Sequence, residues 1–448
     1  MRKVSGILVA ALGAALPAAL GAQTPAAAPV SLSLSQAVAI ARDTTPAVQL
    51  AQLRIEESRA RVGEVRSELL PNISGQVGEL NRTFNLRAMG LEFPSAPGQP
   101  SLPDLVGPFS VFDARFRLSQ TLFDPAGWVR TQAARQAVDV STAERVTAAE
   151  SSSQRAAAAY LRAERAQATV AARREDVRLA EELVSVAKTQ SQAGVGTVID
   201  VTRAESQRVT AVGLLRVAEN QAQQAQIELA RAMGVDPGTR FVIADSLFAG
   251  TAGSDAPLSV EEATQRALAA RPELRSAAAM ETAARTTRRS IQAERLPRLD
   301  LVANWGVNGL NVGDAFPTRE IGVQVSVPIL DGLRRESRLQ EQEAVLRETQ
   351  VRSGDLREQV AAEVRAAILD EQSGREQQEV AAERLRLAEE ELRQSRERFE
   401  NGVAGNIEVI NAQSNLVRAR DAVIDARFAT AQARVALARA VGVTGSLR

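Results

Sequence analysis

Four segments of the chain alternate apolar and polar residues, and they fall into two pairs. The clearer pair lies at residues 299–307 and 321–329, on either side of a short turn rich in Gly, Asp and Pro. The other pair starts near Ile73 and Phe112, and a longer Pro-rich loop near residues 93–108 joins its members. A period of two residues is typical of strands with one apolar and one polar face. The pattern therefore predicts two β-hairpins.

A very long helix is predicted after each hairpin. Residues 125–193 and 332–401 each run for roughly 70 residues without an internal proline, and such a helix would span on the order of 100 Å. In both segments apolar residues recur in steps of three and four along one face, as at Leu356, Val360 and Val364, and the remaining faces are rich in Arg, Glu and Gln. This patterning is typical of coiled coils.

Glycine-containing turns end both long helices. Gly194 and Gly196 lie in the first turn, and Gly402 and Gly405 lie in the second. Because glycine tolerates positive φ, these turns are expected to reverse the chain into a second helix, at residues 198–233 and 406–441 respectively. Each long helix thus becomes one arm of an antiparallel helical hairpin.

The chain is an internal duplication. Aligning Leu32 with Leu258 also aligns Pro46 with Pro272, Glu68 with Glu294 and Leu70-Pro71 with Leu296-Pro297, and small shifts then align Asp124 with Asp331 and Gly194-Val195 with Gly402-Val403. Prolines and glycines matching in one order indicate a repeated architecture. Each copy is predicted to hold a first helix (34–70 in copy one, broken near Pro46), a β-hairpin and a long helical hairpin.

Three regions divide the sequence on this basis. Residues 1–22 combine a basic start, a short apolar stretch and small residues, which is the pattern of a signal peptide. Residues 23–257 form the first structural repeat plus a linker, and residues 258–448 form the second. The fold class is mainly α with β.

Composition narrows the possible chemistry. The sequence has no His and no Cys, which argues against imidazole or thiol catalysis and against zinc or haem sites. No cofactor, metal ligand or catalytic residue is expected, and the chain is not expected to be an enzyme. Because 54 basic residues balance 54 acidic ones, no global charge favours binding to nucleic acid.

The strands are long enough for a membrane. Roughly ten residues suffice for a tilted membrane strand, and alternation of apolar and polar residues is the signal of an outer-membrane barrel. We expect the outward, lipid-facing residues to include Phe116, Leu301, Trp305, Val323 and Val325. Four strands cannot close a barrel alone, so the pattern also predicts an oligomer.

The motifs resemble those of TolC-type outer-membrane factors over essentially the whole mature chain. They are Leu32-Ser-Leu-Ser-Gln-Ala with Pro46, Leu69-Leu-Pro, Leu258-Ser-Val-Glu-Glu-Ala with Arg271-Pro-Glu-Leu, Val327-Pro-Ile-Leu-Asp-Gly, and the two tips from Ala193 and Asn401. The resemblance implies a homotrimer whose twelve strands form one barrel in the outer-membrane lipid. It also implies a periplasmic α-helical barrel that continues this β-barrel.

The same resemblance implies functional residues at the tips. The adaptor-docking tips would be Gly194, Val195 and Gly196 in copy one and Gly402, Val403 and Gly405 in copy two. A periplasmic gate would involve Glu408 and Asp200. The family's second acidic position is Asn411 here, and its counterpart in copy one is Arg203, so the sequence departs from the family pattern at this point.

The leading function is therefore a passive exit duct in the outer membrane that extends into the periplasm. It would serve a tripartite efflux system for drugs, metals or other small molecules, with a periplasmic adaptor and an inner-membrane pump as partners. Two alternatives stay open, a type I protein-secretion duct and a periplasmic coiled-coil adaptor. The adaptor reading is weaker because adaptors need only one helical hairpin and carry β-rich modules.

Overall fold

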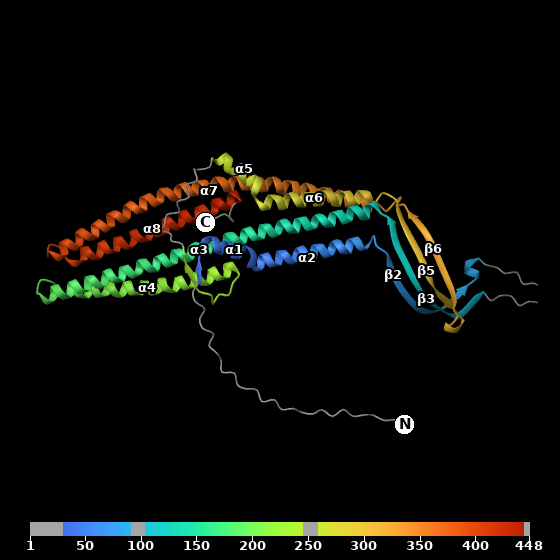
Figure 1. Ribbon diagram of the computed structural model, residues 1–448, viewed down its shortest axis with the longest axis horizontal. Coiled ribbons are helices and arrows are strands. Elements are labelled where there is room, and N and C mark those ends of the chain that lie inside the picture. Colours follow the sequence, from blue (N-terminus) through green and yellow to red (C-terminus); the bar gives the residue numbers. More distant parts are fainter. Residues whose placement is uncertain (1–29, 91–103, 245–258, 443–448) are drawn as a thin grey trace, which may run out of the picture.

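The computed structural model describes residues 30–90, 104–244 and 259–442. Figure 1 shows an elongated molecule with a twisted sheet at one end and two helical hairpins reaching the other. The predicted signal peptide at 1–22 and part of the linker before residue 258 lie outside the described residues. In chain order, the elements are β1 Val30–Leu32, α1 Leu34–Thr44, α2 Pro46–Ser67, β2 Asn72–Asn85, η1 Arg87–Met89, β3 Leu105–Phe123, α3 Pro125–Gln192, α4 Val198–Met233, β4 Phe241–Ile243, α5 Val260–Ala270, α6 Pro272–Ala293, β5 Arg298–Gly309, η2 Val312–Asp314, β6 Phe316–Ser326, α7 Arg334–Glu400 and α8 Asn406–Val441.

The duplicated order of elements is confirmed. Both copies begin with a short helix and a 22-residue helix, α1–α2 and α5–α6, whose boundary is set by Pro46 or Pro272 at the first position of the second helix. Proline fits there because the first helical N–H has no partner within the helix. A capping box starts α1 at Ser33 and α5 at Ser259.

The four long strands form one antiparallel sheet in the order β2-β3-β5-β6. Copy one contributes β2 and β3, copy two contributes β5 and β6, and the β3–β5 pairing joins the copies. Strands β2 and β6 are therefore the sheet's two edges. Within the described residues of a single chain, their outer hydrogen-bonding groups pair with no other strand.

Two predicted strand limits were wrong. The alternating pattern extended the last strand to Val327 and Ile329, but β6 ends at Ser326. Pro328 has no N–H to donate to a ladder, which explains why pairing stops before it. Strand β3 begins at Leu105, inside the segment that was predicted as loop.

A short parallel pair, β1 with β4, was not predicted. It lies at the middle of the molecule, where a buried cluster packs α1, α3 and α4 together. Tyr160 is fully buried there, and its hydroxyl donates a hydrogen bond of 3.0 Å to the carbonyl of Leu32. The start of the described chain is thereby fixed against α3.

The long helices pack in large part through small residues. Alanine is the most frequent buried residue of both α3 and α8, and such interfaces allow helix axes to approach closely. The two hairpins, α3–α4 and α7–α8, lie side by side in Figure 1. Among the described residues, none of the helices combines the length and apolar character needed to cross a membrane.

Candidate conduit and docking surfaces

Gly194 and Gly402 turn the chain at the far end of the two hairpins. Their φ angles are 76° and 72°, a left-handed conformation that side chains other than glycine rarely adopt. Beyond each glycine, a valine N–H donates back to the last helical turn: Val195 to the carbonyl of Gln190 at 3.0 Å, and Val403 to that of Arg398 at 2.9 Å. Both valine side chains project into solvent, with 80% and 69% of their surface exposed.

The two tips are tied to each other. Gln190 Nε2 donates to the carbonyl of Phe399 at 3.1 Å, and Asn406 Nδ2 donates to the carbonyl of Asp200 at 2.7 Å. Asn406 is fully buried. Beneath these bonds, an apolar cluster from α3, α4, α7 and α8 includes Leu392, Val409 and Leu416. The tips therefore form one continuous surface, which sequence periodicity could not show because these contacts link separate hairpins.

The four predicted gate residues have different local roles. Asp200 completes a capping box with Thr197 at the start of α4. Glu408 accepts a hydrogen bond of 3.2 Å from Arg398 Nε across the second hairpin. Arg203 and Asn411 are both exposed, and Arg203 has no ion pair in the described part of the chain. The structure thus brings Glu408 to an arginine that the sequence reasoning did not single out.

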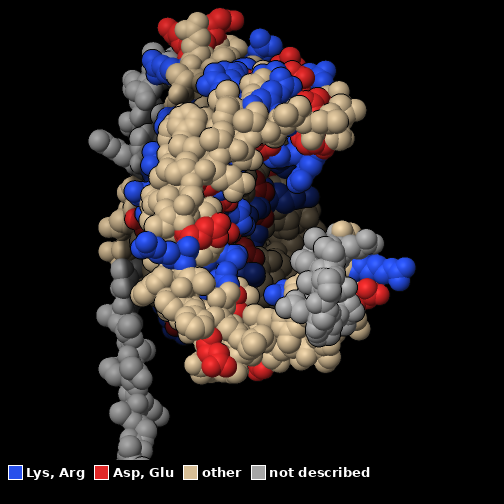
Figure 2. Space-filling model, turned by 90° about the vertical axis from the view of Figure 1, so that its right-hand side faces the viewer, with Lys and Arg blue, Asp and Glu red and all other residues tan. Residues whose placement is uncertain are grey.

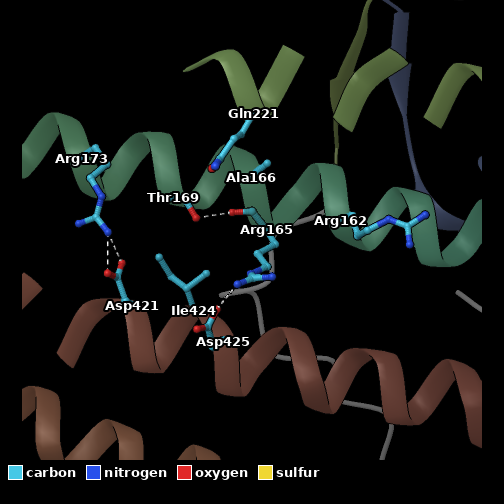
Figure 3. A pocket seen from close by; sticks show the side chains of 9 residues that line it. All are labelled: Arg162, Arg165, Ala166, Thr169, Arg173, Gln221, Asp421, Ile424 and Asp425. Carbon is cyan, nitrogen blue, oxygen red and sulfur yellow. Dashed lines mark hydrogen bonds and ion pairs between the residues drawn. The ribbon is translucent and has the colours of Figure 1, made fainter. Parts of the chain in front are cut away.

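A groove of about 470 Å³ lies between α3, α4 and α8, roughly midway along the hairpins. Figure 3 shows ion pairs crossing it from α3 to α8. Arg173 donates to both carboxylate oxygens of Asp421 at 2.6 Å and to Asp176 at 2.7 Å, and Arg165 lies 2.7 Å from Asp425. Burial opposes the charge of Arg173, but these carboxylates outweigh burial and raise its pKa above the usual value. The ion pairs across this groove connect the two hairpins. Neither the groove nor these pairs were predicted.

The sheet has one mainly apolar face. Phe116 lies opposite Trp305, Leu301 lies opposite Val323, and Leu299 lies opposite Val325. Side chains directly opposite each other in a ladder point to the same side, so all five predicted lipid-facing residues share one face. Four of them are between 60% and 68% exposed in the single chain, namely Val323, Phe116, Val325 and Trp305.

The opposite face of the sheet is polar. Among the charged strand residues, the register puts four arginines and three carboxylates on it: Arg82, Arg115, Arg117, Arg298, Asp113, Asp300 and Glu320. Figure 2 views the molecule from the sheet end, and charged side chains gather in the hollow, whereas the outer wall is mostly uncharged. The two faces of the sheet therefore differ, one being mainly apolar and the other carrying most of the charged strand residues.

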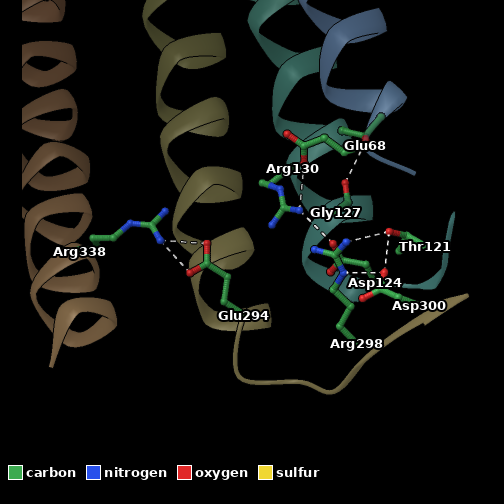
Figure 4. A network of polar contacts seen from close by, with 10 residues as sticks. Glu68, Thr121, Asp124, Gly127, Arg130, Glu294, Arg298, Asp300 and Arg338 are labelled. Atoms are coloured by element: carbon green, nitrogen blue, oxygen red, sulfur yellow. Dashed lines mark hydrogen bonds and ion pairs between the residues drawn. The ribbon is translucent and has the colours of Figure 1, made fainter. Parts of the chain in front are cut away.

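An ion pair repeats at the junction of sheet and helices. Arg130 on α3 lies 3.2 Å from Glu68, and the corresponding Arg338 on α7 lies 2.7 Å from Glu294. Figure 4 shows both pairs, together with Arg298 and Asp300 at the start of β5. The repeat alignment had matched the two glutamates, but not their arginine partners. Each pair connects the C-terminal end of the 22-residue helix of its copy, α2 or α6, to the long helix.

Metal ligands would have to come from Asp and Glu, since the sequence has no His or Cys. Across residues 30–90, 104–244 and 259–442, no three such carboxylates gather in a way that could hold a metal ion. Most carboxylates named above face arginines instead. The chemistry of these surfaces is ion pairing and apolar contact.

Two curated relatives show sequence similarity over large parts of the chain. Protein CyaE of Bordetella pertussis is 26% identical over 399 residues, which cover 86% of this chain and 78% of that protein. Outer membrane efflux protein BepC of Brucella suis is 26% identical over 267 residues, covering 58% of this chain and 56% of BepC. The chain thus spans little more than half of BepC.

The fold is shared with solved outer-membrane proteins. The structure of VceC from Vibrio cholerae superposes with a TM-score of 0.72 at 17% identity, covering 91% of this chain and 96% of VceC. Residues 37–235 and 263–443 match the outer membrane efflux protein family. The chain belongs to this family, and its TolC-like fold is that of channel proteins. It is a protein of the outer membrane whose helical part extends into the periplasm.

Proposed function

We propose that this protein is the passive exit duct of a tripartite efflux system for small molecules. Three copies would join through the edge strands β2 and β6 into one twelve-stranded barrel. The observation that carries the proposal is the two-faced sheet, whose edge strands β2 and β6 each pair with only one strand among the described residues. Helical hairpins long enough to cross a periplasm continue this sheet. In this arrangement the polar face lines the conduit and the apolar face contacts lipid.

The tips supply the docking surface in this proposal. Val195 and Val403 present aliphatic side chains at the end farthest from the sheet, where a periplasmic adaptor carrying an inner-membrane pump would meet them. The hydrogen bonds between the tips support docking onto both hairpins at once. Energy for transport would come from the partner pump.

The gate belongs to the same proposal. Three copies of Glu408 around the axis would form an anionic ring at the entrance, and like charges in a narrow pore attract cations. Arg398 partly neutralises each carboxylate through its 3.2 Å contact with Glu408. Asn411 contributes no charge, so the entrance carries one ring at this position, with Asp200 and Arg203 on the neighbouring hairpin.

Deleting the gene and re-expressing variants tests this function. Loss of the native protein should raise sensitivity to exported compounds, and membranes should contain heat-resistant trimers when it is restored. A soluble periplasmic product, or no change in sensitivity together with loss of an exported protein, would overturn small-molecule efflux.

For the gate, single-channel recordings of Glu408→Ala should show weaker cation preference than the native trimer, while Glu376→Ala on α7 away from the tips should match it.

A further inference from the structure

The polar face of the sheet carries unlike charges that are held apart. Arg117 on β3, Asn304 on β5 and Glu320 on β6 are directly opposite one another in the ladder. Arg117 Nε donates to Asn304 Oδ1 at 3.3 Å, and Asn304 Nδ2 donates to Glu320 Oε2 at 3.1 Å. The amide thus lies between the two charges, which are two strands and roughly 10 Å apart. Both charged side chains are exposed.

The neighbouring charges on this face are paired differently. Arg115 and Asp113 form an ion pair along β3, with side chains only 29% and 34% exposed. Near the helices, Arg298 pairs with Asp300 at 2.9 Å. These two pairs are locally neutral, whereas Arg117 and Glu320 each bond to an uncharged amide. Arg82, farther along β2, lies over the Phe84 ring at 4.8 Å and is a third charge without a carboxylate partner in the described chain.

We propose that Arg117 and Glu320 determine the charge selectivity of the membrane section of the conduit. This inference rests on the proposed function, in which the polar face lines the conduit. The strands are ordered β2-β3-β5-β6. Around a wall built from three protomers, Arg117 on β3 and Glu320 on β6 therefore alternate, with one strand between each positive and each negative side chain. Arg117 and Glu320 offset each other, as do the two local pairs, so Arg82 leaves one excess positive charge per protomer on this face and the membrane section favours anionic solutes. Removing Arg117 or Glu320 changes this balance by one charge.

Replacing either Arg117 or Glu320 with a neutral residue leaves the opposite charge unbalanced on this face. Glu320→Gln leaves Arg117 and Arg82 and is expected to shift the reversal potential of the trimer toward anion preference. Arg117→Gln leaves Glu320 and is expected to shift it toward cation preference. The screening length is about 10 Å at 0.1 M salt and about 30 Å at 0.01 M, so both shifts should grow as salt is lowered. Comparison with the native channel removes the constant contribution of the entrance.

Ile321 provides the matched control. It follows Glu320 on β6, points to the opposite face and is 75% exposed in the single chain. Because the sequence has no cysteine, Glu320→Cys and Ile321→Cys each create one reactive site. A charged, water-soluble thiol reagent should change the single-channel current of Glu320→Cys and leave that of Ile321→Cys unchanged.

Purified native trimers and the four variants would be recorded in planar bilayers across a salt gradient at low ionic strength. Opposite shifts for Arg117→Gln and Glu320→Gln support the inference. Shifts of the same sign, no shift in channels that insert normally, or reagent effects at residue 321 instead of 320 would overturn it. A native chain that forms no channel at all would instead overturn the proposed function, so the two failures are distinguishable.

Discussion

Arg271 is the most deeply buried cation among the ion pairs of the described chain, with 3% of its side chain exposed. It lies at the corner between α5 and α6, contacts Glu273 at 3.2 Å and donates to Glu363 on α7. Burial raises the pKa of Glu363, but the hydrogen bond and charge of Arg271 outweigh burial and hold that pKa below its ordinary value of 4.5. A carboxylate with a lowered folded pKa stabilises the native state above that ordinary value and loses this contribution as the pH falls through the folded pKa.

Glu363→Gln should therefore lower the free energy of unfolding near pH 7 by about 1–3 kcal/mol, because a buried guanidinium loses a charged partner. The difference from the native protein should shrink below about pH 4.5. Glu383→Gln, on the same helix but in the exposed pair with Arg386, is the control and should unfold like the native chain. Denaturant unfolding at several pH values measures both, and equal loss in the two variants would contradict the prediction.

Asp124 is another buried carboxylate paired with an arginine, at the junction of sheet and helices. Its side chain is 8% exposed and accepts a 2.9 Å bond from Arg130, whereas Glu68, the other partner of that arginine, is 57% exposed. We expect Asp124→Asn to destabilise by about 1.5–3 kcal/mol and Glu68→Gln by at most about 1 kcal/mol. Thermal unfolding of the two variants against the native chain provides the check, and a larger loss for Glu68→Gln would refute this ranking.

At the scale of elements, local signals set most boundaries. Pro46 and Pro272 begin helices, Gly194 and Gly402 end them, and the alternating segments are strands in the structure. The β1–β4 pair could not be predicted, since strands of three residues have no period and the partners are about 200 residues apart. The cross-hairpin contacts of Gln190 and Asn406 were missed for the same reason: periodicity reports on one helix, not on which helix faces it.

The tips are the elements whose role is most directly testable. Val195→Glu combined with Val403→Glu should abolish efflux while leaving trimers in the membrane, because charge is placed on an apolar docking surface without altering the glycine turns. Val195→Thr with Val403→Thr keeps the shape and should retain most activity. Cross-linking to the adaptor in cells measures docking directly; cross-linking by the Glu double variant at the native level would exclude these valines from the interface.

For the whole molecule, the facing of the sheet decides how it sits in lipid. Val323→Arg puts a charge on the apolar face and should cost about 2–4 kcal/mol if the residue lies near the bilayer midplane. Gln324→Arg, one residue later on the polar face, should be tolerated. The yield of heat-resistant trimer in outer membranes reports both, and equal tolerance would reverse or remove the proposed facing.

If three copies assemble as proposed, the internal repeat predicts the register between protomers. Within one chain, β3 of copy one pairs with β5 of copy two, with Ser119 opposite Val302. The duplication aligns Ser119 with Ser326 on β6, and Val302 with Gln76 on β2. If β6 of one protomer meets β2 of the next as β3 meets β5, Ser326 lies opposite Gln76 of the neighbouring copy.

Pairs of introduced cysteines can test this register, because only side chains that lie opposite each other form a disulfide between protomers. Ser326→Cys with Gln76→Cys should form disulfides between protomers in the oxidising periplasm, giving covalent trimers on non-reducing gels. Ser326→Cys with Gly78→Cys is the control, because a shift of two residues separates the side chains by about 7–8 Å, beyond the reach of a disulfide without backbone movement. The chain has no native cysteine, so every covalent band reports an introduced pair. Stronger cross-linking through residue 78 would mean that the interface between copies does not repeat the β3–β5 pairing within one chain.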